Sequence, residues 1–144
     1  MLVQQILKSK AGSGVTTVAS STTVAEAAGK LAELGIGTVV VSDDGNTALG
    51  ILSERDIVRE LAKSGSGCLS GAVSEYMTSE VVTCDAQATS DQILQKMTEG
   101  RFRHVPVLED GKMIGIVSIG DVVKAQLSEL AMEKDALEGM IMGH

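Results

Sequence analysis

The stretch GILSERD at residues 50–56 recurs, with the same glycine, serine and aspartate, as GIVSIGD at residues 115–121. Working outward from it, the chain repeats over two longer segments: residues 23–45 with 89–111 at an offset of 66, and residues 50–58 with 115–123 at an offset of 65. Two copies of about 60 residues therefore fill most of the 144-residue chain, which indicates a duplicated structural unit.

A predicted helix opens each copy. A hydroxyl residue and a Glu or Gln stand three apart at each start, the spacing of a capping box: Thr23 with Glu26, and Thr89 with Gln92. Apolar residues then recur at helical spacing, which predicts that these faces are core. They are Val24, Ala27, Ala28, Leu31 and Leu34 in one copy and Ile93, Leu94 and Met97 in the other.

Gly35-Ile36-Gly37 ends the first of these helices. A dinucleotide-binding fingerprint needs a strand before the glycines and a helix after them, whereas here a helix comes first and a strand follows. We therefore place Gly35 at or near the left-handed C-cap position.

Two apolar runs separated by a turn follow each helix, which predicts a β-hairpin. The first runs are residues 38–41 and 104–108, the turns contain Asp44-Gly45 and Asp110-Gly111, and the second runs are residues 48–52 and 113–117. Short strands at residues 15–18 and 81–84 precede the helices, and second helices begin near Asp56 and Asp121. The predicted fold is α/β, with two βαββα units.

We place the first unit at residues 1–64, a linker at 65–72, the second unit at 73–127 and a helical extension at 128–144. Residues 63–70 are rich in Gly and Ser, which suits an exposed linker rather than a strand or helix.

Past Asp121, apolar residues alternate at spacings of four and three, interrupted only by Lys134: Val123, Leu127, Leu130, Leu137 and Ile141. This seam predicts a partner helix and hence a homodimer or larger homo-oligomer. The alternative is a helix that folds back over its own core.

Composition excludes several classes of function. A formal charge of -7 repels nucleic-acid phosphates, and Tyr76 and Phe102, the two aromatic residues, cannot form a base-stacking platform. Cys68 and Cys84 lack CxxC spacing, so we expect two reduced cysteines and, with only His104 and His144, no metal site. No apolar run is long enough for a membrane span and no signal peptide is evident, so we expect a cytoplasmic protein that binds no nucleic acid or membrane.

The repeated serine and aspartate admit two interpretations. Ser53 and Asp56, like Ser118 and Asp121, can simply cap the helix that follows them. They can also form a site, because an ionised carboxylate suits two ribose hydroxyls while the serine and free backbone N–H groups at a helix start suit phosphate. Their recurrence in the same frame favours a site.

Here the residues resemble the CBS domain family, whose tandem units carry a Gly-apolar-x-Thr/Ser-x-x-Asp motif at this location. The resemblance extends to RHVPV at residues 103–107 and VSEYMT at residues 73–78, and it covers residues 3–123. It implies a stand-alone, bacterial-type tandem CBS pair packed about a pseudo-two-fold axis. It also implies binding of AMP, ATP, NAD or S-adenosylmethionine in the clefts between the two units.

Carried over residue by residue, the resemblance implies that Asp56 and Asp121 take ribose hydroxyls and that Ser53 and Ser118 approach ribose or phosphate. It also implies that backbone near the following residues flanks adenine: Thr17, Thr83, Thr38, Val39, Val41, His104, Val105 and Pro106. The two copies differ at the proline and at Glu54-Arg55, which becomes Ile119-Gly120, so we expect the two sites to differ in affinity or ligand.

Arg101, Arg103 and His104 form a dense basic cluster in an acidic chain, and guanidinium groups suit phosphate oxygens. We expect them to contact phosphates. The alternative is an exposed strand end whose cations pair with Glu99 and Glu109, and Arg55 has the same two interpretations.

No nucleophile, base and orienting acid occur in a catalytic pattern, and His104 is the only internal histidine, so we expect no enzyme and no catalytic cofactor. The predicted function is that of a regulatory sensor that binds AMP, ATP or NAD(H) and changes conformation or assembly. The alternative is a structural dimerisation module with no physiological ligand.

Overall fold

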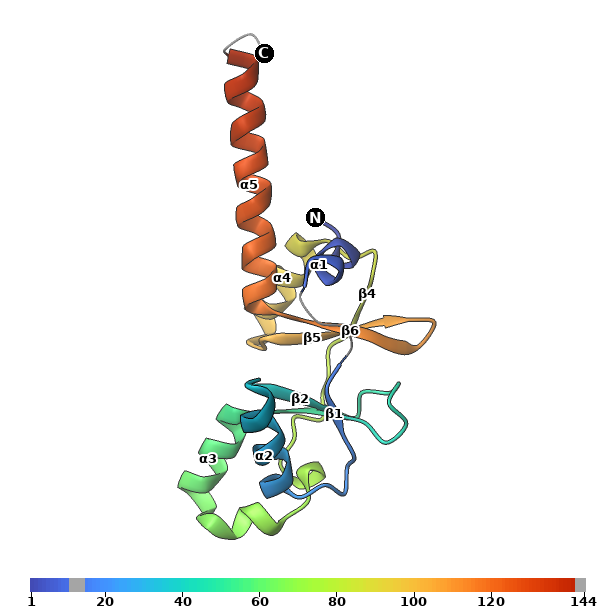
Figure 1. Ribbon diagram of the computed structural model, residues 1–144, viewed down its shortest axis with the longest axis vertical. Coiled ribbons are helices and arrows are strands. Elements are labelled where there is room, and N and C mark those ends of the chain that lie inside the picture. The colour runs from blue at the N-terminus through green and yellow to red at the C-terminus, as the bar shows by residue number, and fades with distance from the viewer. Residues whose placement is uncertain (11–14, 142–144) are drawn as a thin grey trace. The chain divides into compact units, whose positions relative to one another are not determined.

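The computed structural model describes residues 1–10 and 15–141, and its contacts form two compact units (Figure 1). The Asp56 unit comprises residues 15–82 and 110–114, and the Asp121 unit comprises residues 1–10, 83–109 and 115–141. Each unit is named after the aspartate of its repeated motif.

A mixed three-stranded sheet in the order β1-β2-β3 lies in the Asp56 unit. β1 pairs parallel to β2, and β2 pairs antiparallel to β3 with Thr38 opposite Ser53. The elements are β1 (Thr17–Val18), α2 (Val24–Leu34), β2 (Thr38–Val41), β3 (Gly50–Ser53), α3 (Glu54–Ser64) and the 3₁₀ helices η1 (Ser66–Ser70) and η2 (Val73–Glu75).

The second sheet has the same plan in the order β4-β5-β6, with β4 parallel to β5. Its elements and the flanking helices are α1 (Val3–Ser9), β4 (Cys84–Asp85), α4 (Ser90–Gly100), β5 (His104–Glu109), β6 (Lys112–Ser118) and α5 (Ile119–Ile141). The predicted α/β fold with two repeated units is confirmed, although β1 and β3 begin two residues later than expected and β4 three residues later.

Local signals in the sequence explain the helix starts and turns. Thr23 and Thr89 are N-caps whose side chains accept hydrogen bonds from Glu26 N and Gln92 N. Gly35 has φ 64° at the C-cap of α2, as expected. Asp110 and Gly111 have φ 51° and 78°, the two positive values that a tight hairpin turn requires.

Each unit has its own aliphatic core. Val24, Ala27 and Leu31 are buried beneath the β2–β3 sheet, and Ile93 and Met97 are buried in the Asp121 unit, as the helical spacing predicted. Leu34 is 51% exposed, so its assignment to the core was wrong. It is the last residue of α2, where the left-handed turn at Gly35 ends the face that packs on the sheet.

The segment that precedes each repeat packs against the unit that contains the other repeat's motif, as the backbone hydrogen bonds show: the first segment lies on the Asp121 unit and the second on the Asp56 unit. The segment before the first repeat packs on the Asp121 unit, where Val3 N donates to Ala88 O at 2.8 Å and Ser90 N donates to Met1 O at 2.8 Å. The segment before the second repeat packs on the Asp56 unit, where Val73 N donates to Thr22 O at 2.8 Å. Each compact unit is therefore assembled from pieces that are distant in the sequence.

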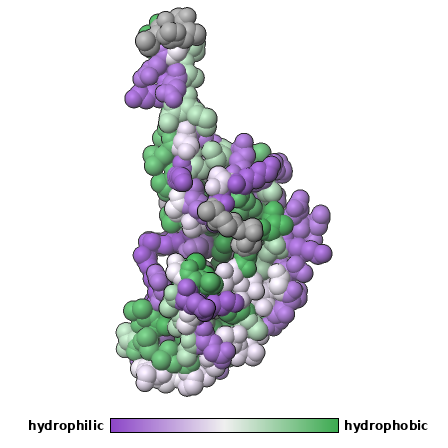
Figure 2. Space-filling model, viewed as in Figure 1, coloured by the Kyte–Doolittle hydropathy of each residue, from purple (hydrophilic) through white to green (hydrophobic). Residues whose placement is uncertain are grey.

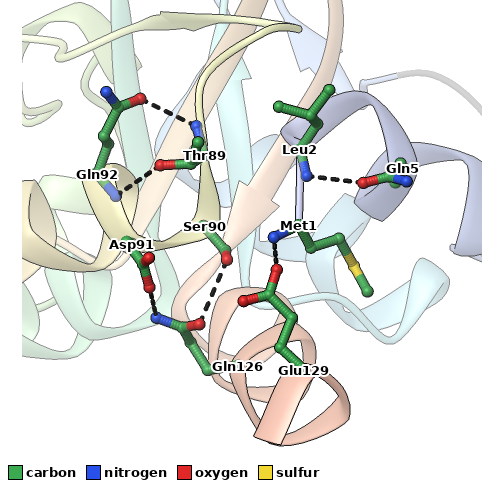
Figure 3. A network of polar contacts seen from close by, with 9 residues as sticks. All are labelled: Met1, Leu2, Gln5, Thr89, Ser90, Asp91, Gln92, Gln126 and Glu129. Atoms are coloured by element: carbon green, nitrogen blue, oxygen red, sulfur yellow. Dashed lines mark hydrogen bonds and ion pairs between the residues drawn. The ribbon is translucent and has the colours of Figure 1, made fainter. Parts of the chain in front are cut away.

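A polar network holds α1, α4 and α5 together in the Asp121 unit (Figure 3). The buried Ser90 Oγ donates to Gln126 Oε1 at 3.4 Å, and the amide of Gln126 also donates to Asp91. The Met1 amino group contacts the Glu129 carboxylate. These contacts anchor the first turns of α5 to its own unit.

The glycine-rich stretch around residues 65–72 is ordered. Ser66–Ser70 forms η1, which contacts α2 and α3, and Cys68 within it is 2% exposed. The expectation that this segment forms no helix was therefore wrong, whereas residues 63–67 and 70 are exposed as expected. Its composition obscured the packing, because Cys68 and Leu69 are apolar side chains that contribute to the unit's interior.

α5 continues without a break through the predicted extension at residues 128–144 as far as Ile141, and His144 lies outside the described residues. All five residues of the apolar seam are exposed, from 42% at Val123 to 84% at Ile141. Figure 2 shows hydrophobic and hydrophilic surface interleaved along this helix. The described part of α5 thus does not fold back over its own core.

Candidate functional site

The Asp56 loop joins β3 to α3. Asp56 Oδ2 accepts hydrogen bonds from Ser53 N at 2.8 Å and Ser53 Oγ at 2.9 Å, while Asp56 N donates to Ser53 Oγ at 3.3 Å. This is a complete capping box. The second carboxylate oxygen, Oδ1, lies 3.4 Å from Arg59 Nη1.

The Asp121 loop joins β6 to α5 with the same backbone pattern. Asp121 Oδ2 accepts from Ser118 N at 2.9 Å, and Asp121 N donates to Ser118 Oγ at 3.1 Å. The capping interpretation is therefore correct for both loops. It leaves room for a binding role, because one carboxylate accepts several hydrogen bonds.

The expected free N–H groups are partly occupied. Glu54 N donates to Gly37 O and Ile119 N donates to Arg103 O, each at 2.8 Å. Together with the serine caps, these bonds use the first and third N–H groups of both helices. The expectation of several free donors for phosphate was therefore too generous, because neighbouring strand ends satisfy them.

Lys10 is the residue that sequence reasoning missed. Its Nζ lies 2.9 Å from Asp121 Oδ2 and donates to Ile116 O at 2.7 Å. Lys10 follows α1 and is more than one hundred residues from its partners in the sequence. A signal was present in the similarity of VQQIL at residues 3–7 to VSEYM at residues 73–77.

The cap hydrogen bonds and the ion pair with Lys10 together determine the charge state of Asp121. Partial burial raises the pKa of the Asp121 carboxyl, but the Ser118 backbone N–H, the Lys10 hydrogen bond and the Lys10 charge outweigh it and leave the pKa below its usual value. Asp121 is therefore ionised near neutral pH and acts as an acceptor.

Two members of the predicted basic cluster lie beside this loop. His104 begins β5, where burial and the nearby charges of Lys10 and Arg103 lower its pKa, with an opposing effect from Asp121. Arg103 is held next to α5 by the bond from Ile119 N. Arg101 stands apart as the left-handed C-cap of α4. In the described part of the chain, Arg101 and Arg103 are exposed, as the alternative of a strand end in solvent expects, and the ion pairs found there join neither arginine to Glu99 or Glu109.

The predicted adenine-flanking residues lie on neighbouring strands of each sheet. Thr17 O accepts a hydrogen bond from Lys30 Nζ at 2.9 Å, and Thr17 pairs with Val40 beside Val39 and Val41. Thr83 immediately precedes β4, and β5 contains Val105 and Pro106. Val39, Val41, Val105 and Pro106 are buried, so these four offer backbone groups rather than side chains.

Arg55 is exposed in the first turn of α3, close in sequence to Asp56 but without an ion pair among the described residues. Of the predicted residues, the Asp56 unit thus brings together Thr17, Thr38, Val39, Val41, Ser53 and Asp56, and the Asp121 unit brings together Arg103, His104, Val105, Pro106, Ser118 and Asp121.

Hollows on the surface do not by themselves reveal the site. One of about 750 Å³ is lined by β4 and α4 residues such as Thr83, Cys84 and Lys96, and it includes neither Ser118 nor Asp121. Another of about 500 Å³ lies between α2 and α3 and includes Gly37 and Glu54. We give more weight to the repeated loop chemistry, because neither hollow is lined by a serine or aspartate of the repeated motif.

The described residues offer neither a metal site nor a membrane span. Within residues 1–10 and 15–141, no group of three His, Cys, Asp or Glu side chains could hold a metal ion. Over the same residues, no helix has the length and apolar character needed to cross a membrane.

Comparison with known proteins decides the family. The model of the CBS domain matches residues 9–63 and again residues 73–128. The chain belongs to the CBS domain family. It is a tandem CBS pair, and both Ser-x-x-Asp loops lie within the matched segments.

The CBS pair has relatives in several organisms. A CBS domain-containing protein of Agrobacterium tumefaciens, ATU1752, is 48% identical, with 88% of this chain and 99% of that chain covered and a TM-score of 0.82. The mitochondrial CBS domain-containing protein CBSX3 of Arabidopsis thaliana is 36% identical over 125 residues. That match covers 84% of this chain but only 61% of the plant protein's length.

Two solved CBS relatives contain adenosine compounds. The protein PAE2072 from Pyrobaculum aerophilum, complexed with AMP, is 27% identical, with 92% and 99% of the chains covered and a TM-score of 0.77. The CBS pair of MJ0100, in complex with 5′-methylthioadenosine and S-adenosyl-L-methionine, is 28% identical, with 90% and 98% covered and a TM-score of 0.75.

Proposed function

We propose that this CBS pair is a regulatory module that binds an adenine nucleotide, such as AMP, ATP or NAD(H), and responds by changing conformation or assembly. The observation that carries the proposal is the duplicated Ser-x-x-Asp loop, which has the same geometry in both units. The adenosine compounds in PAE2072 and MJ0100 support it.

Each loop offers the groups that a nucleoside needs. Asp56 and Asp121 use Oδ2 for the helix cap, and an ionised carboxylate accepts hydrogen bonds with both of its oxygens. We assign Oδ1 to the ribose hydroxyls. Ser53 and Ser118 face ribose or phosphate, and strand backbone near Thr17 and Thr83 flanks the adenine ring. Arg55, Arg101, Arg103 and His104 are assigned to phosphate.

We further propose that the module performs no catalysis and needs no catalytic cofactor. At the Asp121 loop, Ser118 and Lys10 hold the Asp121 carboxylate in a cap and an ion pair. We take this fixed carboxylate to hold a ligand and not to transfer protons. Burial is the main cause that lowers the pKa of His104, and it keeps the imidazole neutral near pH 7.

Thermal unfolding with a panel of nucleotides tests the proposal. A ligand that binds only the folded state stabilises it by about 2.7 kcal/mol at 100 times its dissociation constant. We expect AMP, ATP or NAD(H) to raise the melting temperature more than GMP or CMP. Equal responses to all bases would contradict recognition of adenine, and no response to any nucleotide would contradict the ligand-binding function itself.

One observation favours a second candidate, a homodimerisation module that acts through α5. From Leu127 onward the helix exposes Leu127, Leu130, Met132, Leu137, Met140 and Ile141. An isolated helical arm of this kind is only marginally stable in water, which argues for a covering partner. We propose that the α5 helix of a second copy covers these apolar side chains. Antiparallel pairing of Leu127 with Leu137 brings Lys124 near Glu138 at both ends of the seam and Glu133 near its own copy at the centre, whereas parallel pairing sets Glu133 against Glu138 twice.

Light scattering at micromolar concentration tests this assembly. We expect a dimer or larger species for the full chain and a smaller mass for a chain truncated after Gln126. A monomeric full chain refutes the assembly. An intact dimer after truncation shows that α5 is not its cause.

A further inference from the structure

Lys10 gives the Asp121 loop a cation that is fixed in place. Its ammonium group lies 2.9 Å from Asp121 Oδ2 and 2.7 Å from Ile116 O, and the Lys10 side chain is 31% exposed. An ammonium has three N–H donors. Two are directed at protein oxygens, so the third can donate to a ligand while the pair with Asp121 stays intact.

Other positive groups converge on the same loop. Arg103 O accepts from the first N–H of α5 at 2.8 Å, which places Arg103 at the positive end of that helix. His104 is close enough to Lys10, Arg103 and Asp121 for all three charges to act on it. Lys10 thus offsets the negative charge of Asp121, and the exposed Arg103, whose charge acts on His104, adds a second positive charge nearby.

The Asp56 loop has the same backbone and different charges. Leu7 and Met77 are equivalent, because each packs beneath the first glycine of the repeated motif, Gly115 and Gly50 respectively. Counting three residues onward, Lys10 corresponds to Glu80. The carbonyl equivalent to Ile116 O is Ile51 O, which accepts from the backbone N–H of Thr78 at 2.9 Å instead of from a lysine.

The residue just before the strand that faces each loop also differs in charge between the two copies. Gly37 stands where the other copy has Arg103, and Glu54 Oε1 lies 3.4 Å from the position that a Gly37 Cβ would occupy. Arg59 does contact Asp56, but its side chain is 71% exposed, so solvent weakens that pair. Glu54 and Glu80 thus stand at the positions where the other copy has Ile119 and Lys10, and the exposed Arg55, where the other copy has Gly120, adds one positive charge to the Asp56 loop.

We infer that the Asp121 loop selects adenosine compounds that carry phosphate, with Lys10 and Arg103 as the recognition groups, whereas the Asp56 loop binds adenosine compounds without requiring phosphate. This inference rests on the proposed function. A chain with a net charge of -7 repels phosphate in general, so a preference for phosphate must come from cations fixed at the site.

Calorimetric titration with AMP and adenosine tests the inference, because the two ligands differ only in the phosphate. The background variant Asp56→Ala restricts the measurement to the Asp121 loop. There we expect AMP to bind about tenfold or more tightly than adenosine, in line with one hydrogen bond between charged groups. Adding Lys10→Met should remove most of that difference and change adenosine affinity by less than about twofold.

Two further variants separate recognition from structure. Lys10→Arg keeps the charge and should keep the AMP preference, while Lys8→Met removes an exposed cation from the end of α1 and should leave both affinities unchanged. A melting curve of each variant without nucleotide checks folding, and Lys10→Gln replaces Lys10→Met if the latter unfolds.

The outcomes distinguish the two proposals. If the parent chain binds neither AMP nor adenosine, the proposed function fails and the inference falls with it. If it binds both equally at the Asp121 loop, or if Lys10→Met weakens both equally, the inference is overturned and the proposed function stands.

Discussion

The Asp56 and Asp121 units repeat one backbone with two sets of charges. In both, the strand that faces the loop supplies a carbonyl to the first helical N–H at 2.8 Å, and Ser and Asp cap the same helix. Around this common frame, one unit has Glu54, Arg55, Glu80 and Gly37 where the other has Ile119, Gly120, Lys10 and Arg103.

This comparison separates two kinds of constraint on a duplicated unit. The cap residues and the buried β-branched strands are shared because both copies must start the same helix and fill the same core. Exposed positions beside the loop have no such requirement, so their charges diverged. We therefore expect these charge differences beside the loops to determine any difference in ligand between the two units.

The largest expected effect follows from removing each carboxylate. If Asp56 and Asp121 accept hydrogen bonds from ribose, Asp56→Ala and Asp121→Ala should each eliminate one binding event or weaken it roughly 10- to 150-fold. Loss of the cap costs only about 1 kcal/mol, so both variants should fold. Calorimetric titration measures the effect, with the exposed Glu33→Ala as control. Titrations identical to those of the parent would mean that both aspartates are caps alone.

Substituting the first glycine of the motif should distinguish the two units by stability. A Cβ at Gly50 meets the Met77 side chain and comes within 2.9 Å of the Thr78 backbone oxygen, which cannot move without disturbing its pairing with Ile51. We expect Gly50→Ala to cost about 1–3 kcal/mol. The three atoms nearest to a Cβ at Gly115 all belong to the Leu7 side chain, which can rotate, so Gly115→Ala should cost less. Urea unfolding compares them, and equal losses would contradict this reading of the packing.

The pH dependence of stability should also differ between the units. The folded-state pKa of His104 is lowered by burial and by Lys10, so the unfolded state binds the proton more readily. The neutral His104 therefore contributes fully to folding stability above the unfolded-state pKa of about 6.5, and this contribution is lost as the pH falls below that value toward the folded-state pKa. We expect a weaker pH dependence between pH 7 and 5 in His104→Thr, which installs the residue found at Thr38. An unchanged pH profile would exclude His104 as the cause.

The smallest expected effect concerns Cys84, whose counterpart in the Asp56 unit is Val18. Burial raises the pKa of the Cys84 thiol to about 11, against a lowering effect of Lys96. The thiol should therefore react slowly with iodoacetamide at pH 8 and faster near pH 11. Cys84→Val should change stability by less than about 1.5 kcal/mol, because the two side chains are similar in volume. Rapid alkylation at pH 8 would contradict the buried environment.

Much of the fold was readable from the sequence because its signals are local. The Thr23 and Thr89 caps, the left-handed Gly35 and the hairpin turn at Asp110-Gly111 depend on a few neighbouring residues and were all placed correctly. The repeat strengthened these predictions, because the same local signals occur in both copies. The same repetition drew attention to Ser53, Asp56, Ser118 and Asp121 as a candidate site.

Other features depend on contacts between residues far apart in the chain. The burial of Cys68, the exchange of the segments before each repeat and the pairing of Lys10 with Asp121 exist only once the units are packed. By itself the sequence determined which residues cap helices, line strands and recur in register. Only the tertiary structure decided which cation reaches which carboxylate, because a charge interaction depends on distance in space and not on separation along the chain.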